Sequence, residues 1–198
     1  MIESLLLKGK IKASELDGVA FGCGPGSFTG VRIAAAVAQG IAFGANIGVI
    51  PVSSLQALAQ SANRQHKATH VLASFDARMG EVYWGVYVSD DNGFVMPVQN
   101  DTVCAPEHIT LPADADQHEW CLLGSGADEY VVALKERIGL NMSVNHVVDS
   151  WPAAEDILQI AIPLSNSGSF SKPADAVPVY LRDKVALTTK ERASGERL

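Results

Sequence analysis

The fold is decided by the stretch Gly22-Cys23-Gly24-Pro25-Gly26-Ser27-Phe28-Thr29-Gly30. It stands between a short apolar run at 18–21 and an alanine-rich run at 28–43. Ser27 suits the N-cap of a helix, and Gly44 suits the position just past a helix end. The pattern therefore predicts a strand, a glycine-rich turn and a helix.

The next segments extend this order of elements. An apolar run at 48–52 predicts a second strand, and Ser53 with Gln56 forms a capping-box pattern that opens a helix through Ala62. Strand, helix and strand in succession make a βαβ unit, in which the two strands run parallel.

Two parallel strands cannot cover their own faces. Only a helical piece at 2–7 precedes them. We therefore expect the first sheet to be incomplete: either its opening strands are missing, or a partner chain supplies the cover. The edges at Val19 and Val49 are predicted to be unpaired, and such edges invite association.

After Lys67 the pattern changes. Apolar and aromatic runs at 71–76, 81–88 and 94–98 predict three strands, and Asn92-Gly93 is a strong hairpin signal between the last two. An antiparallel meander follows from this spacing. A fourth strand is predicted at 120–123.

Two helices are predicted in the last third of the chain. The first, at 127–138, follows Gly124-Ser125-Gly126 and ends before Gly139. The second starts at Pro152, and Pro163 should end or kink it. The chain is therefore α/β, with a first unit at 1–66 and a second at 67–198.

Composition narrows the function classes. The 198 residues carry a formal charge of −7, which makes binding to a phosphate backbone by this chain alone a poor prospect. Three scattered cysteines indicate free thiols in a reducing compartment. The apolar stretch at 31–52 contains Gln39, Asn46 and Pro51, so we expect two soluble elements there rather than a membrane span, and a cytoplasmic protein with no membrane partner.

The glycine-rich turns have two interpretations. Gly24 and Gly26 in one half, and Gly124 and Gly126 in the other, could face a nucleotide across a cleft. They could equally be two unrelated tight turns, because neither spacing matches a known phosphate-binding motif.

The helix predicted at 28–43 is almost free of large side chains. Ala36, Gly40 and Gly44 repeat every four residues, a spacing that lets another backbone approach closely. Contact with a partner helix and packing on the parent sheet both remain open.

Motifs for other chemistries are weak. The five histidines show no metal-ligand spacing, and Ser27 is not in a nucleophile elbow. Asp76, Arg78 and Glu81 cluster near a strand end, where an Asp–Arg ion pair steadying the hairpin explains them as well as catalysis does.

Together, the motifs at 22–33, 38–40, 76–84 and 178–182 resemble the bacterial TsaB (YeaZ) family over nearly the whole chain. Two positions depart from the family pattern. Cys23 stands where the family usually has Arg, and Pro163 interrupts a helix that is usually whole.

The resemblance implies two actin/hexokinase-like (ASKHA, RNase H-like) subdomains, the first lacking its opening strands. It implies a scaffold subunit without catalytic or metal-binding residues that binds TsaD and TsaE homologues. That complex forms N6-threonylcarbamoyladenosine at position 37 of tRNAs reading ANN codons. It further implies a homodimer in the absence of TsaD, and tRNA contact only through the complex.

By this resemblance, the partner interface is helical and includes Ser27, Arg32, Ala36, Gly40 and Phe43. The chain requires no cofactor of its own, although the interface could hold ATP or ADP. Two alternatives remain: a nucleotide-binding enzyme of the sugar-kinase type, which would use the four loop glycines, and an M22-type peptidase.

Overall fold

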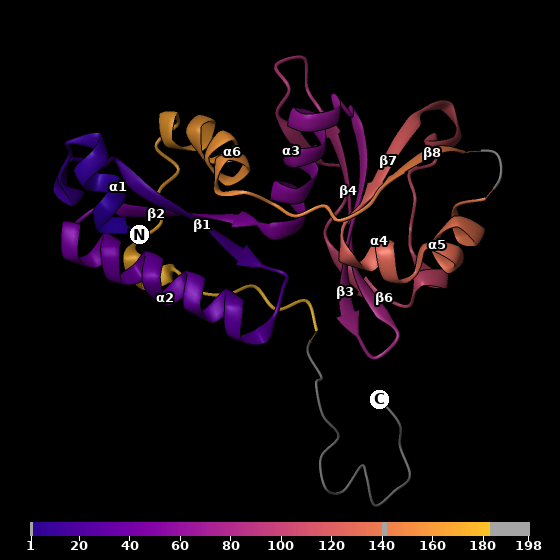
Figure 1. Cartoon of the computed structure of the whole chain (residues 1–198), viewed down its shortest axis with the longest axis horizontal. Coiled ribbons are helices and arrows are strands. Elements are labelled where there is room, and N and C mark those ends of the chain that lie inside the picture. The colour runs from indigo at the N-terminus through magenta and orange to yellow at the C-terminus, as the bar shows by residue number, and fades with distance from the viewer. Residues whose placement is uncertain (1, 140–141, 183–198) are drawn as a thin grey trace, which may run out of the picture.

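The computed structural model describes residues 2–139 and 142–182. The first part of the chain forms α1 (Ile2–Gly9), η1 (Ala13–Glu15), β1 (Gly18–Gly24), α2 (Phe28–Ala45), β2 (Gly48–Ser53) and α3 (Ser54–His66). β1 and β2 pair in parallel, with Gly18 beside Gly48. The predicted βαβ unit is confirmed (Figure 1).

The second sheet contains six strands: β3 (His70–Arg78), β4 (Glu81–Ser89), β5 (Val95–Pro97), β6 (Thr102–Cys104), β7 (Glu119–Leu123) and β8 (Ser143–Val147). Their order is β5-β4-β3-β7-β8, and β6 also pairs with β4. The antiparallel β3-β4-β5 meander is confirmed, and β7 adds in parallel to β3. The sequence does not predict β6 or β8, because β6 is only three residues long and β8 is a partly polar edge strand.

The later helices differ from the predicted ones. The helix predicted at 127–138 is two helices, α4 (Ser125–Glu129) and α5 (Val131–Ile138), divided at Tyr130. Pro163 does not end α6 (Ala154–Asn166), which continues to Asn166 although proline lacks the N–H that an ordinary helical residue donates. The remaining short turns are η2 (Pro106–His108), η3 (Ala115–Gln117) and η4 (Pro173–Asp175).

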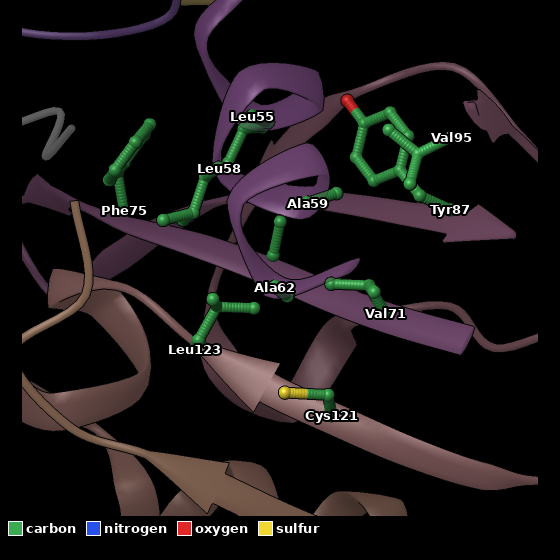
Figure 2. Close-up of a cluster of buried hydrophobic side chains, with 11 residues drawn as sticks. Leu55, Leu58, Ala59, Ala62, Val71, Phe75, Tyr87, Val95, Cys121 and Leu123 are labelled. Carbon is green, nitrogen blue, oxygen red and sulfur yellow. The ribbon is translucent and has the colours of Figure 1, made fainter. Parts of the chain in front are cut away.

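The two sheets and their helices form successive layers. α2 covers one face of β1 and β2, and α6 and α3 pack against the other. α3 also covers the second sheet, where Leu55 and Leu58 pack with Phe75 and Leu123 (Figure 2). α4 and α5 cover the opposite face of that sheet, around Trp84 and Trp120.

The end of the described chain returns to the first sheet. α6 is fastened to α3 by Arg64, whose Nε and Nη2 donate to Asp156 at 2.7 and 3.1 Å. Asp156 is fully buried and also accepts from the backbone N–H of Ala153 at 2.9 Å. The first unit is thus built from two stretches of chain. The boundary at 66/67 stays a prediction, and 183–198 of the second predicted unit lie outside the described residues.

The expectation of an open edge at Val49 is wrong. Val49 and Ser171 exchange two backbone hydrogen bonds of 3.0 and 2.9 Å on the side of β2 away from β1. Phe170 packs so closely over Gly18 and Gly48 that a side chain at either position would collide with its ring. This close approach brings Ser171 to the strand edge.

A half-buried carboxyl group, that of Asp101, joins the two units. Asp101 accepts hydrogen bonds from the Ser53 hydroxyl at 2.7 Å and from the Tyr87 hydroxyl at 2.5 Å. Ser53 also caps α3 by accepting from the Gln56 N–H, but the Gln56 side chain donates to Val95 O, so only half of the predicted capping box forms. Burial raises the pKa of Asp101, against the lowering effect of its two hydrogen bonds.

Replacing Asp101 with Asn should change how stability depends on pH. Because the folded state raises the pKa of Asp101, it holds that proton more tightly than the unfolded chain does. As pH rises from the ordinary carboxyl range through the raised pKa, the wild type should therefore lose stability relative to Asp101→Asn. Urea unfolding over a pH series checks this, with Asp91→Asn in the exposed hairpin loop as control. A stability difference that does not vary with pH would contradict the prediction.

Candidate functional site

α2 carries an unusual distribution of side chains. Its buried residues are one valine, Val31, and three alanines, Ala35, Ala38 and Ala42. Its large apolar side chains face outward, and their exposed fractions are 65% for Phe28, 58% for Ile33, 45% for Val37 and 79% for Phe43. A surface helix normally buries its large apolar residues. This reversal makes the outer face of α2 a candidate interaction surface.

The predicted interface residues lie along this helix. Ala36, Gly40 and Phe43 come together, with Gln39 and Ala174, around a groove of about 400 Å³. A methyl group added at Gly40 or Gly44 would meet nothing within 4 Å. The small residues therefore do not pack on the parent sheet, and they leave the groove open to another molecule.

The two remaining predicted residues lie at the start of α2. The Ser27 hydroxyl accepts from the Gly30 N–H at 3.1 Å, which confirms it as the N-cap. The Arg32 guanidinium lies 3.2 Å from the centre of the Phe28 ring, and its Nη1 donates to Phe28 O at 3.2 Å. Arg32 is the only charged residue of α2, and it is stacked on an exposed aromatic ring.

By length and composition α2 could also cross a membrane, since its mean hydropathy is 1.3 over 18 residues. In the fold, however, Ala35, Ala38 and Ala42 pack against Phe21 and Val49 of the first sheet. The helix is thus part of the first unit.

A second hollow lies between the two units. The volume of this cleft is about 850 Å³, and both glycine-rich turns line it, through Gly26 and Ser125. Five aromatic rings line it: Phe28, Phe75, Tyr83, Trp151 and Tyr180. The sequence patterns do not indicate Trp151, and the only signal for Tyr180 is the motif at 178–182.

The two arginines of the cleft are paired with carboxylates. Arg78 Nη1 lies 2.8 Å from Asp76 Oδ2, which confirms the Asp–Arg pair of the hairpin. Arg182 forms an ion pair with Glu81. Both arginines are therefore neutralised by carboxylates of the chain itself.

Three of the four glycines predicted to face a nucleotide lie against backbone. A side chain at Gly124 or Gly126 would collide with the backbone of Ser74 or Phe75, and one at Gly24 would come within 2.8 Å of Val179 O. Gly24 and Gly124 also have positive φ angles of 114° and 99°. Gly26 lines the cleft. Close packing therefore explains why glycine stands at positions 24, 124 and 126. Nucleotide binding by the four glycines stays a prediction.

No cluster of three or more His, Cys, Asp or Glu side chains suited to a metal ion occurs within residues 2–139 and 142–182.

Comparison with known proteins gives consistent results. Residues 1–161 match the family described as tRNA N6-adenosine threonylcarbamoyltransferase, TsaD. The tRNA threonylcarbamoyladenosine biosynthesis protein TsaB of Escherichia coli K12 is 40% identical over 94% of this chain and 79% of its own length. TsaB of Haemophilus influenzae is 46% identical over 54% of this chain and 48% of its own. The structure of YeaZ from Pseudomonas aeruginosa superposes with a TM-score of 0.82 at 39% identity, over 91% of this chain and 81% of that one.

Glycine substitutions distinguish packed from open positions. Gly126→Ala should destabilise the chain by about 1–3 kcal/mol, because the added methyl group overpacks the contact with β3. Gly40→Ala should stabilise it by about 0.5–1 kcal/mol, because the position is helical and open. Urea unfolding measures both, and equal effects of the two substitutions would refute this distinction.

Proposed function

Because the chain belongs to the TsaB (YeaZ) family, we propose that it is a non-catalytic subunit for tRNA threonylcarbamoyladenosine formation that binds the TsaD-type transferase through the outer face of α2. The similarity to the YeaZ structure supports the α/β fold of actin/hexokinase-like type predicted from the resemblance. The proposal concerns what this chain contributes to the pathway.

The observation that carries the proposal is the exposed apolar face of α2. Ile33, Val37 and Phe43 would all lose contact with water if a partner covered that face. Each such side chain contributes roughly 1.5–3 kcal/mol when it goes from full exposure to full burial. The open positions Gly40 and Gly44 would let a partner backbone come close.

The fold relationship favours a partner of the transferase type. Residues 1–161 match the transferase family itself, and this range includes the helix after the first glycine-rich turn, so we expect the two proteins to share an architecture there. Two related helices could therefore meet across a pseudo-two-fold axis, and a second copy of this chain could use the same surface in the absence of the transferase.

The remaining parts of the proposal follow from the pathway. A TsaE-type subunit would join the same assembly, and tRNA would meet this chain only through it. The net charge of −7 supports that arrangement, since the chain offers few cations for a phosphate backbone. With this tRNA-modifying role, the chain would act in the cytoplasm.

Substitutions on α2 test the proposal. Ile33→Asp and Phe43→Ala should weaken binding to the TsaD-type transferase at least tenfold, because each removes an exposed apolar contact. Binding can be measured by biolayer interferometry with the immobilised transferase.

Val132→Asp is the matched control, since Val132 is 68% exposed on α5 in the other unit. It should bind as the wild type does, and thermal melts should show that all three variants fold. Wild-type affinity in both α2 variants would overturn the proposal.

A second candidate function is nucleotide binding in the cleft. One arrangement favours it: Gly26 and Ser125 face the same hollow, beside exposed aromatic rings on which a base could stack. Against it, Arg78 and Arg182 are both paired with carboxylates, which offset the positive charge that phosphates would need.

Titration calorimetry with ADP tests this second candidate. If the paired arginines exclude phosphates, heat from specific binding should be absent at micromolar concentrations of the isolated chain. Binding at such concentrations that Trp151→Ala abolishes would instead support a nucleotide-binding enzyme.

A further inference from the structure

The segment at 171–182, here called the strap, contains the motif at 178–182 that the proposed function leaves without a role. It leaves the outer edge of β2 at Ser171 and ends at Arg182, the last described residue. In Figure 1 its yellow trace passes along α2 and then toward the second unit.

α2 needs additional contacts, because its own side chains bury little apolar surface against the first sheet. Three of its four buried residues are alanines, and a methyl group removes little apolar surface from water. The helix therefore relies on contacts beyond its own buried side chains to stay in one position.

The strap supplies contacts at several points of α2. Gln39 Nε2 donates to Pro173 O at 3.1 Å. Ala176 is buried in the same cluster as Ala38 and Ala42. Toward the start of the helix, the Tyr180 ring centre lies 5.2 Å from the Arg32 guanidinium carbon. The strap thus runs against the direction of α2 and touches both of its halves.

The strap is also bound to the first sheet. The Val179 N–H donates to Cys23 O at 2.8 Å, at the end of β1. Gly24 makes this approach feasible, because a side chain there would come within 2.8 Å of Val179 O. Gly24, which the sequence predicts for nucleotide binding, is therefore needed for the strap to pack against the end of β1.

The last anchor of the strap lies on the second unit. Arg182 pairs with Glu81 and donates through Nη2 to Arg78 O at 3.3 Å and through Nη1 to Met79 Sδ at 3.4 Å. The Arg182 side chain is only 14% exposed, so solvent screens this ion pair less than a surface pair. One residue thus ties the support of α2 to the β3–β4 turn.

We propose that the strap is a latch that holds α2 in the position in which the transferase meets it, with Arg182 as its positioning residue on Glu81. The proposal rests on the proposed function for its effect on binding. If loosening the strap lowers the fraction of chains with α2 correctly placed, the apparent affinity for the partner falls by that fraction.

The experiment compares Arg182→Gln, Glu81→Gln and the reversed pair Glu81→Arg with Arg182→Glu, all in the full chain. Arg78→Gln is the matched control, because its exposed side chain pairs with Asp76 in the same hairpin. Hydrogen–deuterium exchange reports on α2 without any partner. Biolayer interferometry reports on binding to the TsaD-type transferase.

Arg182→Gln and Glu81→Gln should each speed amide exchange in α2 by about tenfold through local opening, while α3 exchanges as in the wild type. Each should also weaken transferase binding by about three- to tenfold. The reversed pair should restore both properties, which a loss of folding would not allow. Arg78→Gln should change neither property.

Unchanged exchange of α2 in Arg182→Gln would overturn the latch, as would an equal effect of Arg78→Gln or no restoration in the reversed pair. If Arg182→Gln binds the transferase normally while Ile33→Asp does not, the latch fails and the proposed function stands. If both Ile33→Asp and Phe43→Ala bind normally, the proposed function fails, and the exchange measurement still decides whether Arg182 holds α2.

Discussion

The whole arrangement depends on α3, which has to fill the space between two sheets. Leu55 and Leu58 pack into the second sheet, while Ala57 packs with Ile160 and Ala161 of α6 beneath the first. Because a close-packed interior admits few rearrangements, one helix shared by two cores fixes both units relative to each other. The distance from the start of α2 to the β3–β4 turn, and hence the width of the cleft, follows from that shared packing.

The inner face of α2 makes only a small apolar contact with the first sheet. Alanines on its inner face let it lie close to β1 and leave room for the strap, but they bury little apolar surface. Its larger side chains remain in water, where Phe43 alone is 79% exposed. A partner that covers this face would bury the apolar area that the isolated chain leaves exposed, so the same distribution of side chains weakens the helix alone and favours the complex.

The cleft between the two units brings together glycine-rich turns and paired arginines. Two glycine-rich turns line the cleft, but neighbouring backbone occupies the space beside Gly24, Gly124 and Gly126. Arg182 is likewise committed to Glu81. The lining of the cleft also includes the exposed aromatic rings of Phe28, Trp151 and Tyr180.

The sequence by itself determined the elements whose signals are local. Ser27 at the N-cap and Asn92-Gly93 in the hairpin act on backbone within a few residues, so the βαβ unit and the meander were predictable. The row of small residues in α2 was visible too, although whether it faced sheet or solvent was not. Only the tertiary structure decided that Val49 pairs with Ser171 and that Arg182 meets Glu81, 101 residues earlier in the chain. Such contacts depend on how distant segments pack, and no local pattern of residue types specifies that packing.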